Sequence, residues 1–132
     1  MSRRSKKIGG TARPYRALEE LYQALFDQAA DGIFIADVTG RYVEVNQQGC
    51  GTLGYRREEI LALKIEDLIP SEDKERNPLQ LDELRTEGSL LKERVLRCKD
   101  GRLLPVEISA RMLTDGSLLG IVRDISQRKA VQ

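Results

Sequence analysis

The sequence has no histidine, no tryptophan and only two cysteines, Cys50 and Cys98, among its 132 residues. Histidine is the commonest general base and a frequent metal ligand, so its absence removes the usual catalytic triads and zinc sites. The cysteines lack CxxC spacing, which argues against a disulfide framework or a metal centre and favours a reducing cytoplasm. No other catalytic constellation is visible, and the sequence predicts that the chain is not an enzyme.

Long apolar runs are also missing. The longest, such as residues 118–122, are far shorter than the roughly 20 residues that a membrane-spanning helix needs. The chain opens on charged residues with no apolar stretch behind them, so neither a signal peptide nor a membrane partner is expected. With 40% hydrophobic and 33% charged residues, the composition predicts one globular domain.

The net charge of +1 conceals an uneven distribution. Residues 1–16 carry six basic side chains and no acidic one, whereas residues 58–87 carry ten acidic and four basic ones. A basic tail can contact nucleic acid or anionic membranes, but such tails are more often solubilising. We therefore interpret residues 1–14 as a disordered basic tail and expect no nucleic-acid partner.

A helix and a hairpin are predicted next. Residues 15–30 place apolar side chains at helical spacing on one face, which predicts an amphipathic helix. Residues 32–38 and 41–45 are rich in β-branched and aromatic side chains and are separated by a Thr-Gly turn, which predicts a tight β-hairpin. Asn46 follows and is expected to cap a short helical turn.

The middle of the chain predicts short helices. Residues 56–63 and 65–69 have helical patterns, and a further helix is expected after Pro78. Residues 46–55 contain three glycines, so only brief helical turns are expected there.

The last third predicts an antiparallel meander. Residues 89–99, 102–113 and 117–125 are expected to be strands, joined by two Asp-Gly turns. Pro105 has no N–H group and argues for a gap in the strand ladder or an edge position. The full order indicates an α+β fold, a five-stranded antiparallel sheet with short helices on one face and an amphipathic N-terminal helix.

Four segments in this order resemble the PAS sensor domain family over about residues 18–129. ALFDQAADGIFIADVTGRYVEVN is similar to the family's first helix and hairpin, and LGYRREEILALKIEDLIP to its central helices. KDGRLLPVEIS and GIVRDISQRK resemble its closing strands, with Asp124-Ile125-Ser126 in place of Asp-Ile-Thr. The resemblance implies a PAS core at residues 31–126, preceded by the helix at 15–30 and followed by the start of a signalling helix at 127–132.

The resemblance also allows two cofactors to be tested. Haem-binding relatives hold iron through a histidine on the helix before the third strand, and residues 72–88 contain none. Light-sensing flavin relatives use a cysteine at the position of Ile65, and amides at the positions of Leu96, Val106 and Val122. All four residues are apolar here, so neither haem nor a light-sensing flavin is expected, and no cofactor is predicted.

The inner face of the sheet is the candidate ligand site. It is either a filled hydrophobic core or a cavity for an apolar small molecule such as a fatty acid, a quinone or a small aromatic compound. Two of its residues, Ala110 and Gly120, are small enough to leave space. The candidate residues are Phe34, Ala36, Leu96, Val106, Ile108, Ala110, Leu118, Gly120 and Val122.

The two ends of the domain are the candidate output. The N-terminal helix either packs on its own sheet or pairs with a second copy in a homodimer, through Leu18, Leu21, Tyr22 and Leu25. Asp124 and Ser126 lie where the last strand becomes the outgoing helix, and they are the candidate signal relay. The resemblance implies a cytoplasmic sensory module of two-component or similar signalling, relaying to an effector such as a histidine kinase, C-terminal or in trans. The alternative is a ligand-free constitutive dimerisation scaffold.

Overall fold

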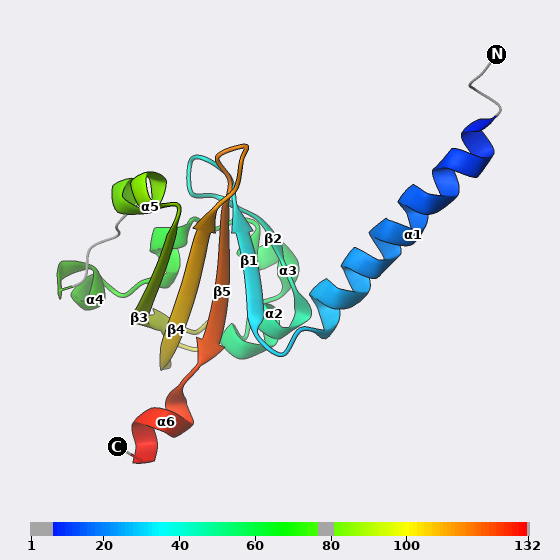
Figure 1. The fold of residues 1–132 in the computed structure, drawn as a ribbon. Helices are drawn as coiled ribbons and strands as arrows, with labels where there is room; N and C mark the ends of the chain where they lie inside the picture. The colour runs from blue at the N-terminus through cyan, green and yellow to red at the C-terminus, as the bar shows by residue number, and fades with distance from the viewer. Residues whose placement is uncertain (1–6, 77–80, 132) are drawn as a thin grey trace.

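The computed structural model describes residues 7–76 and 81–131, and its centre is a five-stranded antiparallel sheet in the order β2-β1-β5-β4-β3. Short helices lie behind this sheet and beside β3, while helix α1 points away from the body of the domain (Figure 1). The predicted α+β fold is confirmed. The strands are β1 (Gly32–Ala36), β2 (Tyr42–Val45), β3 (Ser89–Arg97), β4 (Leu103–Met112) and β5 (Leu118–Asp124).

The helices have short spans, apart from α1. They are α1 (Lys7–Gln28), α2 (Gln47–Leu53), α3 (Arg57–Ile60), the 3-10 helix η1 (Ile65–Leu68), α4 (Ser71–Arg76), α5 (Leu81–Glu87) and α6 (Ser126–Val131). As predicted, the Asn46 side chain caps α2, by accepting a hydrogen bond from the backbone N–H of Gly49.

Strand register decides which side chains face the helices. Phe34 of β1 lies opposite Gly120 of β5, and Gly120 in turn lies opposite Ala110 of β4. Because side chains alternate across a strand, these residues and their i±2 neighbours share the inner face. The buried core forms between this face and the short helices, where Leu53, Ile60 and Val106 are fully buried.

One expectation about the elements needs correction. Residues 7–14 belong to helix α1, so the helix begins eight residues before the predicted start at residue 15, and the predicted disordered tail does not cover them. Once a helix is nucleated, each added residue gains a hydrogen bond, so poor helix formers can extend it outward. Residues 1–6 of that predicted tail lie outside the described residues.

Pro105 is not on an edge strand, because β4 lies between β3 and β5. Its carbonyl oxygen accepts a hydrogen bond from the N–H of Ile125, just beyond the end of β5. In a strand the N and C=O of one residue point to the same side, so the missing donor faces the end of the β4–β5 ladder. The missing N–H group that the sequence suggested as a gap in the ladder therefore lies at the end of the β4–β5 pairing, where few hydrogen bonds are lost.

Candidate functional site

A cavity of about 110 Å³ lies between the inner face of the sheet and the short helices. Its walls are almost entirely apolar, and all five strands contribute to them. Structure therefore brings together eight of the nine residues proposed from sequence: Phe34, Ala36, Leu96, Ile108, Ala110, Leu118, Gly120 and Val122. The ninth, Val106, is fully buried in the core but does not line the cavity.

Gly120 explains part of the free space. A methyl group built at its α-carbon would meet only the carbonyl oxygen of Phe34, at 3.9 Å. The opposite residue on β4 is Ala110, another small side chain. The space in front of these two residues is therefore open, and a larger side chain at position 120 would enter the cavity.

The rest of the wall comes from residues that the sequence analysis did not propose. The helices close the cavity opposite the sheet, and β2 supplies one aromatic side chain. The added apolar residues are Tyr42, Ile65, Leu68, Ile69, Leu84, Leu90 and Leu119. The short helical segments have no clear periodicity from which an inward face could be assigned.

Two cationic side chains also line the cavity, both from β3. Lys92 and Arg94 follow the same alternation as Leu96, so counting back by twos from that residue would have placed them inside. The guanidinium of Arg94 donates to the carboxylate of Asp73 on α4 at 2.9 Å. Only 6% of the Arg94 side chain and 17% of the Asp73 side chain are exposed. The cavity is therefore apolar with one cationic side.

Tyr42 packs against Phe34 with 5.5 Å between ring centroids and an interplanar angle of 55°. Burial, with a smaller contribution from the negative charge of Asp67, raises the pKa of Tyr42 far above its ordinary value. The phenol therefore stays neutral at physiological pH, and the cations of β3 are the charged side chains that face the cavity among the described residues.

The side chains of the cavity wall differ from those that, by resemblance, contact the cofactor in haem-binding and light-sensing flavin relatives. Ile65, Leu96 and Val122, which occupy the flavin-contacting positions by resemblance, do line it, and all three are apolar. They offer no hydrogen-bond partner to the polar edge of a buried ring system. The chain also lacks the histidine that usually binds haem iron. Within residues 7–76 and 81–131, no group of three or more His, Cys, Asp or Glu side chains could hold a metal ion.

Asn46 connects the cavity's front wall to α1. Its side-chain oxygen accepts hydrogen bonds from the N–H groups of Ile33 and Gly49, both at 2.9 Å. Its amide nitrogen donates to the carbonyl oxygens of Phe26 at 2.8 Å and Asp31 at 3.1 Å. All four side-chain hydrogen-bonding positions are thus used inside the protein, which fixes the end of α1 against β1 and α2.

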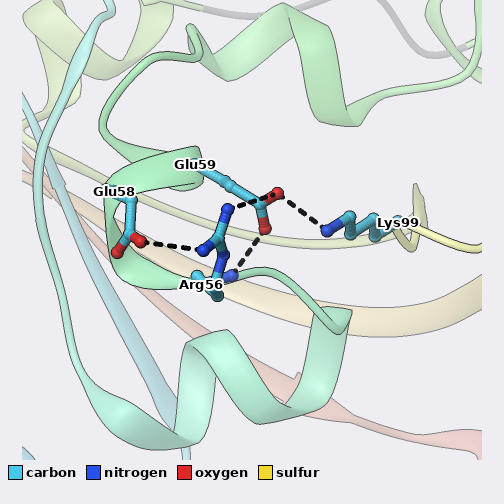
Figure 2. A network of polar contacts seen from close by, with 4 residues as sticks. All are labelled: Arg56, Glu58, Glu59 and Lys99. Atoms are coloured by element: carbon cyan, nitrogen blue, oxygen red, sulfur yellow. Dashed lines mark hydrogen bonds and ion pairs between the residues drawn. The ribbon is translucent and has the colours of Figure 1, made fainter.

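A charged network on the surface joins α3 to the β3–β4 turn (Figure 2). The carboxylate of Glu59 accepts from the backbone N–H of Arg56 at 2.9 Å and from the ammonium of Lys99 at 2.7 Å. The Arg56 guanidinium also lies 3.3 Å from Glu58 and 3.6 Å from Glu59. The backbone hydrogen bond from Arg56, and then the contact with Lys99, lower the pKa of Glu59 to about 2.

The incoming and outgoing segments meet at one end of the sheet. Asp31, just before β1, forms an ion pair with Arg123 of β5 at 3.1 Å. The next residue, Asp124, accepts hydrogen bonds from the N–H of Ser126, at 2.8 Å, and from its hydroxyl group. Helix α6 begins at Ser126 rather than after it, so the carboxylate of Asp124, not the Ser126 hydroxyl, contacts the start of the helix.

Helix α6 is also attached to the outer face of the sheet. Arg128 lies 3.7 Å from both Glu93 and Glu107, which face each other across β3 and β4. Directly opposed like charges destabilise a strand pair, and the cation between them offsets this repulsion.

The candidate dimer residues on α1 are exposed. Leu18, Leu21, Tyr22 and Leu25 are between 49% and 65% exposed, so this stripe does not pack on the protein's own sheet. Phe26, one position beyond Leu25, is buried and stacks on Tyr22 at 5.5 Å. Within residues 16–28 the C-terminal end of the helix is therefore anchored to the domain, and the apolar stripe has no cover within the described part of the chain.

Comparison with known proteins agrees with this geometry. Residues 20–125 match the PAS fold family. The chain is 35% identical over 118 residues to the methyl sulfide methyltransferase-associated sensor of Methanosarcina acetivorans, covering 86% of this chain and 12% of that protein. It is 25% identical over 130 residues to sporulation kinase E of Bacillus subtilis, covering 97% of this chain and 17% of the kinase.

A solved structure gives the same result. The crystal structure of a domain of the sensory box sensor histidine kinase/response regulator from Geobacter sulfurreducens superimposes with a TM-score of 0.69 at 40% identity. The match covers 81% of this chain and 94% of that domain. The chain therefore belongs to the PAS family of sensory signal-transduction domains, as its motifs predicted, and it spans less than a fifth of the length of the curated relatives. No helix in residues 7–76 or 81–131 is both long and apolar enough to cross a membrane.

Proposed function

We propose that this domain binds a small molecule in the cavity and passes the resulting change to an effector through helix α6. The observation that carries the proposal is that one strand, β5, lines the cavity and also ends at Asp124, whose carboxylate contacts the start of α6. Leu118, Gly120 and Val122 of β5 line the cavity, and Asp124 follows two residues later. A ligand that displaces β5 also displaces the carboxylate that contacts the start of α6. Asp124 and Ser126 are the relay residues in this proposal.

The same proposal includes a homodimer formed through α1. The exposed stripe of Leu18, Leu21, Tyr22 and Leu25 has the 3–4 spacing of an interhelical seam. An exposed apolar stripe of this kind is typical of a surface that another protein covers, and a second copy offers the matching stripe. We expect Leu21→Glu to shift the chain to monomer in analytical ultracentrifugation, whereas Gln23→Glu, on the other side of the helix, should not.

The effector belongs to another module. The relatives named above are a sensor and a kinase, each far longer than this chain, which supports an effector such as a histidine kinase, joined after α6 or acting in trans. A PAS domain itself is regulatory, and any kinase reaction would take place in that module. We also propose that the domain lies in the cytoplasm, as its sequence predicts.

A cavity-filling substitution tests ligand binding against the alternative of a ligand-free scaffold. Native mass spectrometry of the purified chain should show a non-covalent small molecule, and Gly120→Val should abolish it by occupying the space that this glycine leaves open. Ser109→Val is the matched control, because Ser109 is exposed on the outer face of the neighbouring strand. The scaffold would be supported instead if the wild type contained no ligand and the Gly120→Val variant had the same dimerisation and stability as the wild type.

A further inference from the structure

The charged side chains that line the cavity are both cationic, and both come from β3. Lys92 and Arg94 are two positions apart on β3, so their α-carbons are roughly 6.6–6.8 Å apart along the strand and both side chains point inward. No carboxylate lines the cavity among the described residues. An apolar chamber with two cations on one wall is complementary to a molecule that has an apolar body and an anionic group.

Arg94 is the more deeply placed cation. A buried guanidinium is costly without an opposite charge, and Asp73 supplies that charge at 2.9 Å. Asp73 belongs to α4, a helix of six residues in which Ser71, Glu72 and Glu75 are exposed. The internal counter-ion of Arg94 thus comes from a short surface helix, while Arg94 itself belongs to a nine-residue strand paired along its whole length.

Resting on the proposed function, we propose that the ligand is an organic carboxylate with an apolar body, and that its carboxylate replaces Asp73 on Arg94. The guanidinium offers a planar fork that suits a carboxylate, and Lys92 adds a second positive charge on the same wall. The apolar body fills the space in front of Ala110 and Gly120. Loss of its partner frees Asp73, and with it α4, to move towards solvent.

The size of the cavity suggests a probe. The cavity has a volume of only about 110 Å³, so the probe is a short unbranched carboxylate, octanoate. 1-Octanol and octanamide have the same chain without the charge, and they serve as the matched neutral ligands.

Binding is measured by titration calorimetry on the whole chain. Octanoate should bind the wild type at least about tenfold more tightly than 1-octanol or octanamide, since its carboxylate meets the positive charge of Lys92 in addition to the guanidinium that it takes over from Asp73. Asp73→Asn removes the internal competitor and should tighten octanoate binding by a further tenfold or so, leaving 1-octanol unchanged. Glu72→Gln, an exposed carboxylate on the same helix, is the control and should change neither ligand.

A second variant guards against misfolding. Arg94→Gln combined with Asp73→Asn removes both charges of this ion pair together, so it should fold and lose the preference for octanoate over 1-octanol. Hydrogen exchange should quicken in α4 when octanoate binds the wild type. Equal binding of octanoate and 1-octanol in the wild type and in Asp73→Asn overturns the proposed ligand class but leaves a ligand-binding cavity. Absence of binding by all three probes, with a ligand-free protein in native mass spectrometry, overturns the proposed function as well.

Discussion

Removal of the Asn46 side chain is the sharpest test of how the domain is held together. This residue is fully buried, and its amide makes four hydrogen bonds to backbone groups of four different residues. Two of these partners, Phe26 and Asp31, belong to α1 and the segment that follows it. Asn46→Ala therefore breaks the connection between α1, β1 and the N-terminus of α2 at a single point.

The expected cost follows from the number of bonds. An intramolecular hydrogen bond contributes about 1 kcal/mol net, and a buried group left without a partner costs more. Four such bonds predict a loss of about 4 kcal/mol, which is a large share of the roughly 5–15 kcal/mol by which a domain is stable. With a urea slope of about 2 kcal/mol per molar, the unfolding midpoint should fall by about 2 M.

Urea unfolding followed by circular dichroism measures this loss. Gln47→Ala is the control, because Gln47 is an exposed amide next to Asn46. Asn46→Asp keeps the accepting oxygen but sets a second oxygen against two carbonyl groups, so its deficit relative to wild type should shrink as the pH falls and protonation restores a donor. A loss below about 1 kcal/mol in Asn46→Ala would refute the view that this side chain fixes the end of α1.

Two further predictions use glycines and a surface carboxylate. Gly49→Ala should destabilise the domain by about 1–3 kcal/mol in urea unfolding, since the added methyl group would lie 2.8 Å from Val45. Gly51→Ala on the same helix is the control: its methyl group meets nothing within 4 Å, and it should stabilise the domain by about 0.5–1 kcal/mol. Equal effects of the two substitutions on stability would contradict the close approach of α2 to β2. The pKa of Glu59 is lowered to about 2, below its ordinary value of 4.5, so its contribution to stability is complete above about pH 4.5 and is lost as the pH falls towards 2. Wild type should therefore lose more stability than Glu59→Gln over that interval, and a Glu59 pKa near 4.5 by NMR titration would count against the contacts with Arg56 and Lys99.

The strands and their faces could be predicted because a strand has a period of two. The apolar alternation of residues 102–113, with the Asp-Gly turns on both sides, defines β4 and its inner face without knowledge of its neighbours. Eight of the nine predicted lining residues follow from this parity. Val106 obeys the same parity but lies in the filled part of the core, since parity identifies the face and not the depth at which side chains leave a gap.

The cationic wall was missed for a different reason. Lys92 and Arg94 have the polarity of outward-facing residues, although their positions relative to Leu96 require them to point inward. The burial of Arg94 depends on Asp73, twenty-one residues before it, and a contact of that range has no local signature. The cap formed by Asn46 was predictable from its position before α2, but its bonds to Phe26 and Asp31 depend on how α1 returns to the sheet.

The ion pair between Asp31 and Arg123 has a mechanical consequence. β1 and β5 are antiparallel neighbours, and the chain enters the first and leaves the second at the same end of the pair (Figure 1). Tension applied between α1 and α6 would first load the contacts of Asn46 with Phe26 and of Arg128 with Glu93 and Glu107. It would then break the ion pair and separate the ladder one residue pair at a time, starting from Gly32 and Val122. Contacts that break one after another resist less force than contacts that must break together. The two ends of the domain are therefore joined by a connection that yields to a small force.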